Sequence, residues 1–192
     1  MKLWETDAVP HLQSIAKDGL MFTRFYANSF RTDRGLVAIL SGFPAQPNMS
    51  LMKYPKKTAN LPSIARHLKE AGYGTKYYYG GDADFTNMRS YLVSQGINDI
   101  VSDMSFPVKD RMSKWGVPDD KLFERLKADL KDDRIGTPML RIIQTSSSHE
   151  PFDVPYNRLA DERLNAFAFA DSCVGNFVSA LKASPQWKSS LV

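Results

Sequence analysis

Short apolar or aromatic runs alternate with segments of helical periodicity along nearly the whole chain, and this alternation limits the possible folds more than any other feature. Strands are expected at 20–26, 75–79, 98–101 and 139–144, because turn residues bound each run. Helices are expected at 9–19, 36–40, 62–72, 84–96, 118–130 and 161–181, where apolar residues recur every three or four positions. Such an order predicts an α/β fold, a layered sandwich with a mainly parallel central sheet.

Two segments stand outside this alternation. Residues 42–60 carry three prolines and many polar residues, which predicts an irregular excursion. The last residues, 189–192, have the pattern of a β-strand that has only begun. We therefore expect the chain to be a fragment of a larger domain.

The composition is that of a folded globular protein, with 43% apolar and 24% charged residues. The net charge of +4 is small and spread along the chain, so we expect no nucleic-acid partner. The only cysteine, Cys173, lies in the apolar stripe of the last predicted helix and is expected to be buried. No signal peptide is present, and no stretch approaches the roughly 18 continuous apolar residues of a membrane span.

Three polar loops follow predicted strands, at 28–35, 80–89 and 145–152, and ligands of parallel sheets bind beyond such strand ends. In the first loop, Thr32 precedes a helix whose N-terminal N–H groups and dipole favour an anion. Its hydroxyl could be a nucleophile in that position. The alternative is that Thr32 is only the N-cap of the helix.

The second loop contains Asp82, Asp84, Asn87 and Arg89. The planar guanidinium of Arg89 suits a phosphate or carboxylate, which indicates a small polar ligand. The alternative is that Asp84 caps the following helix and Arg89 is solvated or pairs with an acidic neighbour.

The third loop contains His149, which follows the predicted strand 139–144 directly and could bind an oxyanion or act as an acid or base. The other two histidines, His11 and His67, lie on predicted helix faces. Motifs of P-loop, dinucleotide-binding, serine-hydrolase and zincin proteins are absent. No local cluster of metal ligands occurs, so any metal site would combine distant segments.

At these loops the sequence resembles the alkaline phosphatase and sulfatase superfamily. The stretch from Pro10-His11-Leu12 to Phe25-Tyr26-Ala27-Asn28 is similar to a conserved segment of that superfamily. Three further motifs, RTDRG with LSG (31–42), YGGDADFTNMR (79–89) and SHEPF (148–152), resemble its lipoteichoic acid synthase branch, the phosphoglycerol transferases. The C/S-x-P-x-R motif of conventional sulfatases is absent, which makes sulfate-ester hydrolysis the weaker interpretation.

The resemblance implies roles for five residues. Thr32 would be the nucleophile and would also bind a divalent metal such as manganese, accepting a phosphoglycerol group as a covalent phosphothreonine. Asp82, Arg89 and His149 match positions that bind the substrate head group, and Asn87 stands at such a position where a characterised relative has tryptophan. Implied partners are a phospholipid head group or other phosphoglycerol donor and a glycan or glycerol acceptor.

The resemblance also implies that residues 1–192 are a partial catalytic domain. A first strand with a metal-binding glutamate would precede Met1, and an Asp-His metal pair would follow Val192. We therefore expect the chain alone to be inactive. Family members are held by N-terminal membrane helices and work on the outer side of the bacterial cytoplasmic membrane, which implies an extracytoplasmic location. The alternatives are a phosphate- or sulfuric-ester hydrolase of the same superfamily and a non-catalytic domain that binds anionic head groups.

Overall fold

The computed structural model describes residues 3–132 and 137–192. The described chain divides into two compact units. One, here called the helical unit, consists of residues 3–22, 106–132 and 145–192. The other, here called the sheet unit, consists of residues 23–105 and 137–144.

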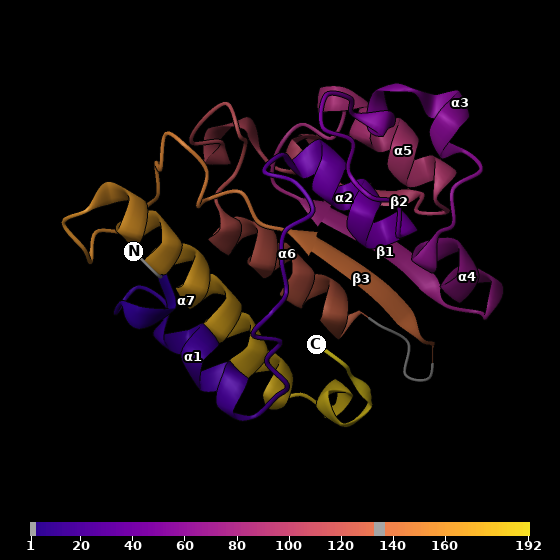
Figure 1. Cartoon of the computed structure of the whole chain (residues 1–192). Helices are drawn as coiled ribbons and strands as arrows, with labels where there is room; N and C mark the ends of the chain where they lie inside the picture. The colour runs from indigo at the N-terminus through magenta and orange to yellow at the C-terminus, as the bar shows by residue number, and fades with distance from the viewer. Residues whose placement is uncertain (1–2, 133–136) are drawn as a thin grey trace. The chain divides into compact units, whose positions relative to one another are not determined.

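The sheet unit is built on three parallel strands in the order β2-β1-β3 (Figure 1). They are β1 (Gly74–Tyr79), β2 (Asp99–Val101) and β3 (Met139–Gln144). Tyr77 of the central strand pairs with Ile100 on one side and Ile142 on the other. The expected parallel sheet and three of its four expected strands are therefore confirmed.

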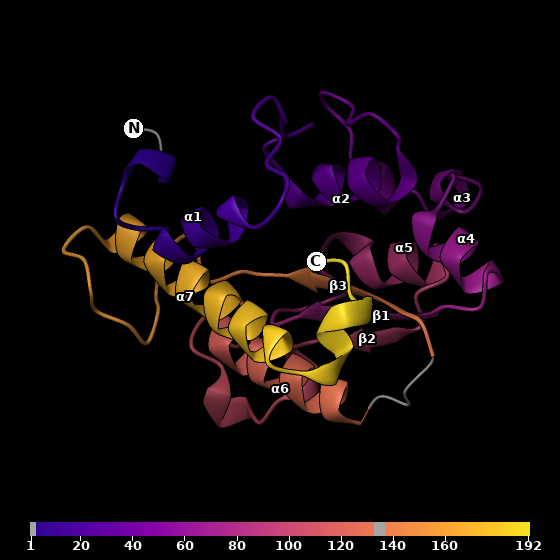
Figure 2. The same cartoon turned by 90° about the horizontal axis from the view of Figure 1, so that it is seen from below.

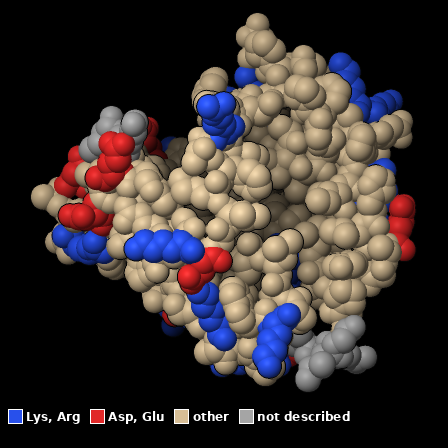
Figure 3. All heavy atoms as spheres, turned by 60° about the horizontal axis from the view of Figure 1, so that its bottom comes forward, with Lys and Arg blue, Asp and Glu red and all other residues tan. Residues whose placement is uncertain are grey.

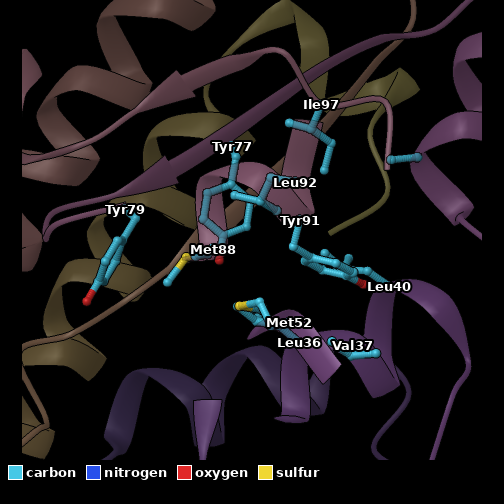
Figure 4. Packing of buried hydrophobic residues seen from close by; sticks show 11 residues of the cluster. Leu36, Val37, Leu40, Met52, Tyr77, Tyr79, Met88, Tyr91, Leu92 and Ile97 are labelled. Atoms are coloured by element: carbon cyan, nitrogen blue, oxygen red, sulfur yellow. The ribbon is translucent and has the colours of Figure 1, made fainter. Parts of the chain in front are cut away.

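Helices cover this sheet and enclose an apolar core. They are α2 (Thr32–Ser41), α3 (Pro55–Thr58), α4 (Ile64–Glu70) and α5 (Met88–Ser94), with short 3-10 turns η2 (Leu51–Lys53), η3 (Phe85–Asn87) and η4 (Asp103–Ser105). Figure 4 shows Leu36 and Leu40 of α2 facing Met52, while Tyr77 of β1 lies among Met88 and Leu92 of α5. Burial of these side chains provides most of the free energy that orders the unit.

A buried polar network ties the helices of the sheet unit together. The Ser41 hydroxyl lies 2.7 Å from the Tyr91 hydroxyl and donates to Gln95 Oε1 at 3.1 Å. Gln95 Nε2 donates to the Thr58 carbonyl at 3.0 Å, and Ser63 Oγ donates to the Gln95 carbonyl at 2.8 Å. Burial raises the pKa of Tyr91 to about 12, so its phenol stays neutral within this network.

The helical unit contains α1 (Pro10–Lys17), α6 (Asp119–Lys131) and α7 (Glu162–Lys182), with 3-10 turns at Leu3–Glu5, Val108–Asp110 and Pro185–Ser189. Figure 2 shows α7 beside both α1 and α6. The Asp171 carboxylate of α7 accepts hydrogen bonds from the backbone N–H groups of His11 and Leu12, at 2.9 and 2.8 Å. It therefore caps α1, because it binds two N–H groups of the first turn that have no partner within the helix. Gly175 lies opposite His11, where a Cβ atom would come within 2.4 Å of the imidazole.

By length and composition alone α7 could cross a membrane, since its most apolar 18-residue window has a mean hydropathy of 1.2. Inside the protein 56% of that window is buried, as in a core helix, so the indication is weak. Cys173 lies on this helix and is buried, which confirms the expectation from its apolar stripe. Burial raises the pKa of its thiol to about 12, so the thiolate is strongly disfavoured.

Four local expectations are wrong. Residues 20–26 form no strand: Leu20, Phe25 and Tyr26 are at least 80% exposed, and in the described chain no strand pairs with them. A strand needs the hydrogen bonds of a neighbour, so β-propensity alone does not create one. Residues 190–192 likewise form no strand with the described residues. Helix α4 is capped by Ser63 instead of beginning at Pro62, and the excursion at 42–60 contains η2 and α3.

Charges of both signs are interspersed on the face drawn in Figure 3, where uncharged surface separates the described Lys and Arg side chains. This agrees with the small net charge of +4. Within the helical unit Lys182 pairs with Asp18 at 2.7 Å. That hydrogen bond and the positive charge hold the pKa of the Asp18 carboxyl below its usual value.

Candidate active site

Thr32 is the first residue of α2 and is exposed. The preceding Arg31 is the N-cap by backbone conformation, and its carbonyl accepts the first helical hydrogen bonds from the N–H groups of Arg34 and Gly35. The N–H groups of Thr32 and Asp33 precede those bonds and belong to the positive end of the helix. No described residue forms a hydrogen bond with the Thr32 hydroxyl. The helix start therefore offers a hydroxyl next to backbone donors, which suits an anionic group.

Side chains around Thr32 hold the helix start in place. Arg31 Nε contacts the buried Asp33 carboxylate at 3.4 Å. Arg34 Nη1 donates to the Pro47 carbonyl at 2.5 Å, and the Asn28 side chain accepts from the backbone N–H of Ala45 at 2.5 Å. The residues before and after Thr32 are thus tied to the segment 45–47. Thr32 itself is left out of these contacts.

The loop after β1 joins its charged residues in one chain of contacts. The Asp82 carboxylate accepts from the backbone N–H of Asp84 at 2.8 Å. Asp84 Oδ1 in turn lies 2.8 Å from Arg89 Nε. This contact engages one of the five N–H donors of the guanidinium, so Asp84 orients Arg89 without using up its binding capacity. Asp82 and Arg89 are therefore both held in place by contacts with Asp84.

The alternative interpretation, that Asp84 caps the helix α5, is wrong. Asn87 is the N-cap residue, with a left-handed backbone (φ 67°), and its amide nitrogen donates to the Met52 carbonyl at 3.0 Å. Thr86, directly before it, is also left-handed (φ 55°). A β-branched residue there stores about 1–3 kcal/mol of strain, and such strain is typical of functional loops.

Tyr79 ends β1 next to this loop and is almost fully buried. Burial raises the pKa of its phenol first, and the negative charges of Asp82 and Asp103 raise it further. The phenol therefore stays neutral at the strand end, directly before the segment that carries Asp82. This is the strand-end position that the sequence predicted for a binding loop.

His149 is exposed in the loop that follows β3, within the helical unit. Its Nδ1 lies 2.9 Å from the Glu150 carbonyl oxygen. Trp115 packs on the imidazole with ring centroids 4.1 Å apart and an angle of 43° between the ring planes. Together with Ser146, Ser147 and Pro151 these rings line a shallow hollow in the surface.

The backbone of this loop is held by Asp119, the first residue of α6, whose side chain is fully buried. Its carboxylate accepts from the N–H of Ser146 at 2.9 Å and from that of Ser147 at 3.3 Å. In return the Ser147 hydroxyl accepts from the N–H of Asp119 at 2.9 Å. Burial raises the pKa of Asp119, and the hydrogen bonds from Ser146 and Ser147 oppose that rise.

The structure thus places the five predicted site residues in two groups. Asp82 and Asn87 lie in the segment between β1 and α5, and Arg89 lies in the first turn of α5. The 3-10 turn η2 contacts both η3 of that segment and α2, which begins with Thr32. His149 belongs to the helical unit.

Sequence reasoning missed Trp115 and Asp119. An Asp after Pro118 has the pattern of an ordinary helix start, and nothing local signals a partner 27 residues later in the chain. The sequence signal for Trp115 was a large aromatic residue in the Gly- and Pro-containing stretch 115–118, where a loop is expected.

The described residues do not fit a complete divalent-metal site. Among residues 3–132 and 137–192, no three His, Cys, Asp or Glu side chains lie together in a geometry for metal binding. Thr32 would contribute one oxygen, whereas Ca²⁺ or Mg²⁺ takes six or more ligands. We therefore derive no catalytic step through a metal from this chain.

The sulfatase family profile matches residues 3–192, so the chain belongs to the sulfatase family. Its curated relatives include phosphoglycerol transferase I of Xanthomonas axonopodis pv. citri (strain 306), 24% identical over 96% of this chain. The same enzyme of Xanthomonas campestris pv. campestris (strain B100) is 25% identical over the same share. The chain spans 29% of the length of each relative. Members of the superfamily are in general dependent on divalent metals.

Solved structures confirm the fold. A protein of the alkaline phosphatase superfamily from Vibrio parahaemolyticus matches 96% of the chain with a TM-score of 0.86 and 30% identity. The lipoteichoic acid synthase LtaP from Listeria monocytogenes matches 94% with a TM-score of 0.81 and 18% identity. The Streptococcus pyogenes phosphoglycerol transferase GacH, solved with sn-glycerol-1-phosphate, matches 93% with a TM-score of 0.65 and 15% identity. The chain spans 47%, 47% and 52% of these three proteins.

Proposed function

We propose that this chain is part of the catalytic domain of a phosphoglycerol transferase and carries its nucleophile, Thr32. The observation behind the proposal is an exposed threonine at the first residue of a ten-residue helix, in a family whose curated relatives are phosphoglycerol transferases. The donor would be a phospholipid head group or another phosphoglycerol ester.

In the proposed reaction Thr32 Oγ1 attacks the phosphorus of the donor. A bond forms between Oγ1 and phosphorus, the bond from phosphorus to the donor's alcohol oxygen breaks, and the threonine proton leaves with that alcohol. In the second step the hydroxyl of a glycan or glycerol acceptor attacks the same phosphorus. Thr32 is released and regains a proton from the acceptor. This division into two steps is typical of covalent catalysis by weak nucleophiles.

The N–H groups of Thr32 and Asp33 would stabilise the charge that develops on the phosphoryl oxygens, because they are oriented before the reaction begins. Arg89, oriented by Asp84, would bind a phosphate oxygen, and Asp82 would accept a hydrogen bond from a glycerol hydroxyl. His149 would contribute a further contact to the head group. Asn87, whose amide nitrogen is bound to Met52, would bind through its carbonyl oxygen.

We further propose that the transfer requires a divalent metal such as manganese, with Thr32 as one ligand and the other ligands outside residues 1–192. A bound metal would make the hydroxyl more acidic and shield the phosphoryl charge. The protein would be held at the outer side of the bacterial cytoplasmic membrane, where phosphoglycerol lipids are available. Chelation by EDTA is expected to abolish transfer by the full-length protein, and Mn²⁺ is expected to restore it.

A trapping experiment tests the proposal. Full-length protein is incubated with phosphatidylglycerol vesicles and no acceptor, and the peptide that contains Thr32 is analysed by mass spectrometry. A phosphoglycerol adduct on Thr32, absent in Thr32→Ala and present in the exposed control Thr23→Ala, supports the proposal. Rapid hydrolysis of phosphate or sulfate esters without such an adduct would favour a hydrolase. Binding of the lipid without any adduct or turnover would favour a non-catalytic domain.

A further inference from the structure

Trp115 and His149 share a single hydrogen-bond acceptor. Trp115 Nε1 donates to the Glu150 carbonyl at 2.6 Å, and His149 Nδ1 lies 2.9 Å from the same oxygen. The two rings are also in contact, with centroids 4.1 Å apart. The indole is thus fixed at its nitrogen and packs by its ring on the imidazole.

This arrangement determines where the imidazole carries its proton. A carbonyl oxygen only accepts hydrogen bonds, so Nδ1 of His149 must be the donor. The neutral ring then has a lone pair on Nε2, and the charged ring has an N–H there. In either state Nε2 is the nitrogen left for a ligand of the hollow that His149 and Trp115 line.

The backbone beneath the ring is equally constrained. The N–H of His149 donates to the Ser146 carbonyl at 3.0 Å, and Ser146 is held by the buried Asp119 carboxylate. Rotation about the side-chain bonds of His149 is therefore the main freedom that remains. The contact with Trp115 restricts that rotation.

The positive charge beside the indole suits an anionic ligand. Lys114 Nζ lies 5.2 Å from the centre of the Trp115 ring, a cation–π distance. Lys114 does not itself line the hollow, whose lining includes His149 and Asp153, so a head group there would contact the imidazole while Lys114 adds positive charge beside the indole.

We propose that Trp115 is a positioning residue for His149: it holds the imidazole with Nδ1–H on the Glu150 carbonyl and leaves Nε2 to the phosphate-bearing head group. There Nε2 would accept from a glycerol hydroxyl when the ring is neutral and donate to a phosphate oxygen when the ring is charged. The identity of that ligand rests on the proposed function, whereas the orientation of the ring rests on the contacts of this chain alone. For histidines that bind metals, loss of an orienting partner commonly changes affinity or activity by 10–100-fold, and we expect an effect in the same direction here. Trp115 is therefore expected to matter for binding without touching the reacting atoms.

The test is the tautomer of His149, read from the ¹⁵N chemical shifts of its ring at about pH 9, where histidines in general are neutral. In the full chain the Nδ1–H form is expected to dominate. Trp115→Ala is expected to shift the ring toward the Nε2–H form, and Trp115→Phe, which keeps an aromatic ring without the N–H donor, is expected to lie between. The control is Trp187→Ala, a tryptophan beside Lys182 in the same unit, which should change nothing.

Two results would overturn the proposal. One is an Nε2–H tautomer in the unsubstituted chain, a measurement that needs no variant to fold. The other is an unchanged Nδ1–H tautomer in Trp115→Ala or, if that variant does not fold, in Trp115→Phe. A separate titration of the full-length protein with sn-glycerol-1-phosphate distinguishes failure of the proposed function. If His149 has the Nδ1–H tautomer but its Nε2 signal does not shift when this probe is added, the head-group role is refuted. The positioning role of Trp115 is not affected by that result. Where the probe binds, Trp115→Ala is expected to weaken it on the order of tenfold.

Discussion

Thr32 and His149 are positioned in opposite ways. Thr32 takes its place from the backbone of α2 and has no side-chain partner among the described residues. His149 is exposed, but its ring contacts Trp115, its Nδ1 contacts the Glu150 carbonyl, and its loop is held by Asp119. A helix start supplies orientation and backbone donors by itself, whereas a side chain on a loop needs other side chains to orient it. Substitutions in the two regions should therefore have different consequences.

The largest effect is expected for Thr32→Ala. Transfer by the full-length protein should fall at least about a thousandfold, because the attacking oxygen is removed. Thermal stability should stay nearly unchanged, since the side chain is exposed and forms no hydrogen bond with a described residue. Thr32→Ser keeps a hydroxyl and should retain measurable transfer. An enzyme in which Thr32→Ala remains fully active would contradict the role given to this helix start.

Asp119→Ala should show the reverse pattern, with stability as the primary loss. The N–H groups of Ser146 and Ser147 would lose their acceptor in a buried place, which costs about 2–4 kcal/mol for the pair. Chemical denaturation measures this change. The control is Asp132→Ala, an exposed residue at the other end of α6. A variant as stable as the parent would show that the loop of His149 does not depend on Asp119.

The same carboxyl predicts a pH dependence. Its pKa is raised in the folded state, so the folded protein binds a proton more readily than the unfolded one. The stability that Asp119 contributes is therefore fully present below its ordinary pKa and is lost as the pH rises through the raised value. Asp119→Asn cannot titrate, so its stability relative to the parent should improve as the pH rises through this window. Denaturation of both proteins across acidic and neutral pH measures the difference, and a constant difference would refute the prediction.

A smaller effect is expected where one side chain orients another in the sheet unit. Asp84→Ala removes the 2.8 Å contact between Asp84 Oδ1 and Arg89 Nε. Both side chains are more than a third exposed, so the free energy of unfolding should change by less than about 1 kcal/mol. Binding of sn-glycerol-1-phosphate should weaken by about tenfold through misorientation of Arg89. Arg89→Lys should lose at least as much, since a lysine has no planar fork. Equal binding by Asp84→Ala would mean that Arg89 needs no partner.

The smallest effect concerns strain. Thr86→Gly should raise stability by about 0.5–1 kcal/mol, because glycine adopts φ 55° without a penalty. Substrate affinity should not improve, since the looser backbone holds Asp82 and Arg89 less firmly. Differential scanning calorimetry and a binding titration measure the two quantities. A simultaneous gain in both would show that the strain has no function.

Some helices and strands could be predicted from the sequence more accurately than others. Strand β3 begins and ends where the apolar run 139–144 predicts, and α7 differs from its expected bounds by one residue at each end. The run 20–26 has an equally strong strand pattern and forms no strand. The difference is that β3 has a paired neighbour in β1, and pairing is not a property of the run itself.

The sequence by itself determined the α/β class and the segments that carry Thr32, Asp82, Asn87, Arg89 and His149, because periodicity and turn residues act over a few positions. It predicted four strands, and only pairing in the folded chain decided which three of them form. The family followed from short motifs of the same kind. Only the tertiary structure decided that Asp119 holds the loop of His149, that Trp115 orients its ring and that Asp171 caps α1. These contacts join residues 27, 34 and 160 positions apart, and burial and hydrogen bonding over such separations arise only when the chain is folded.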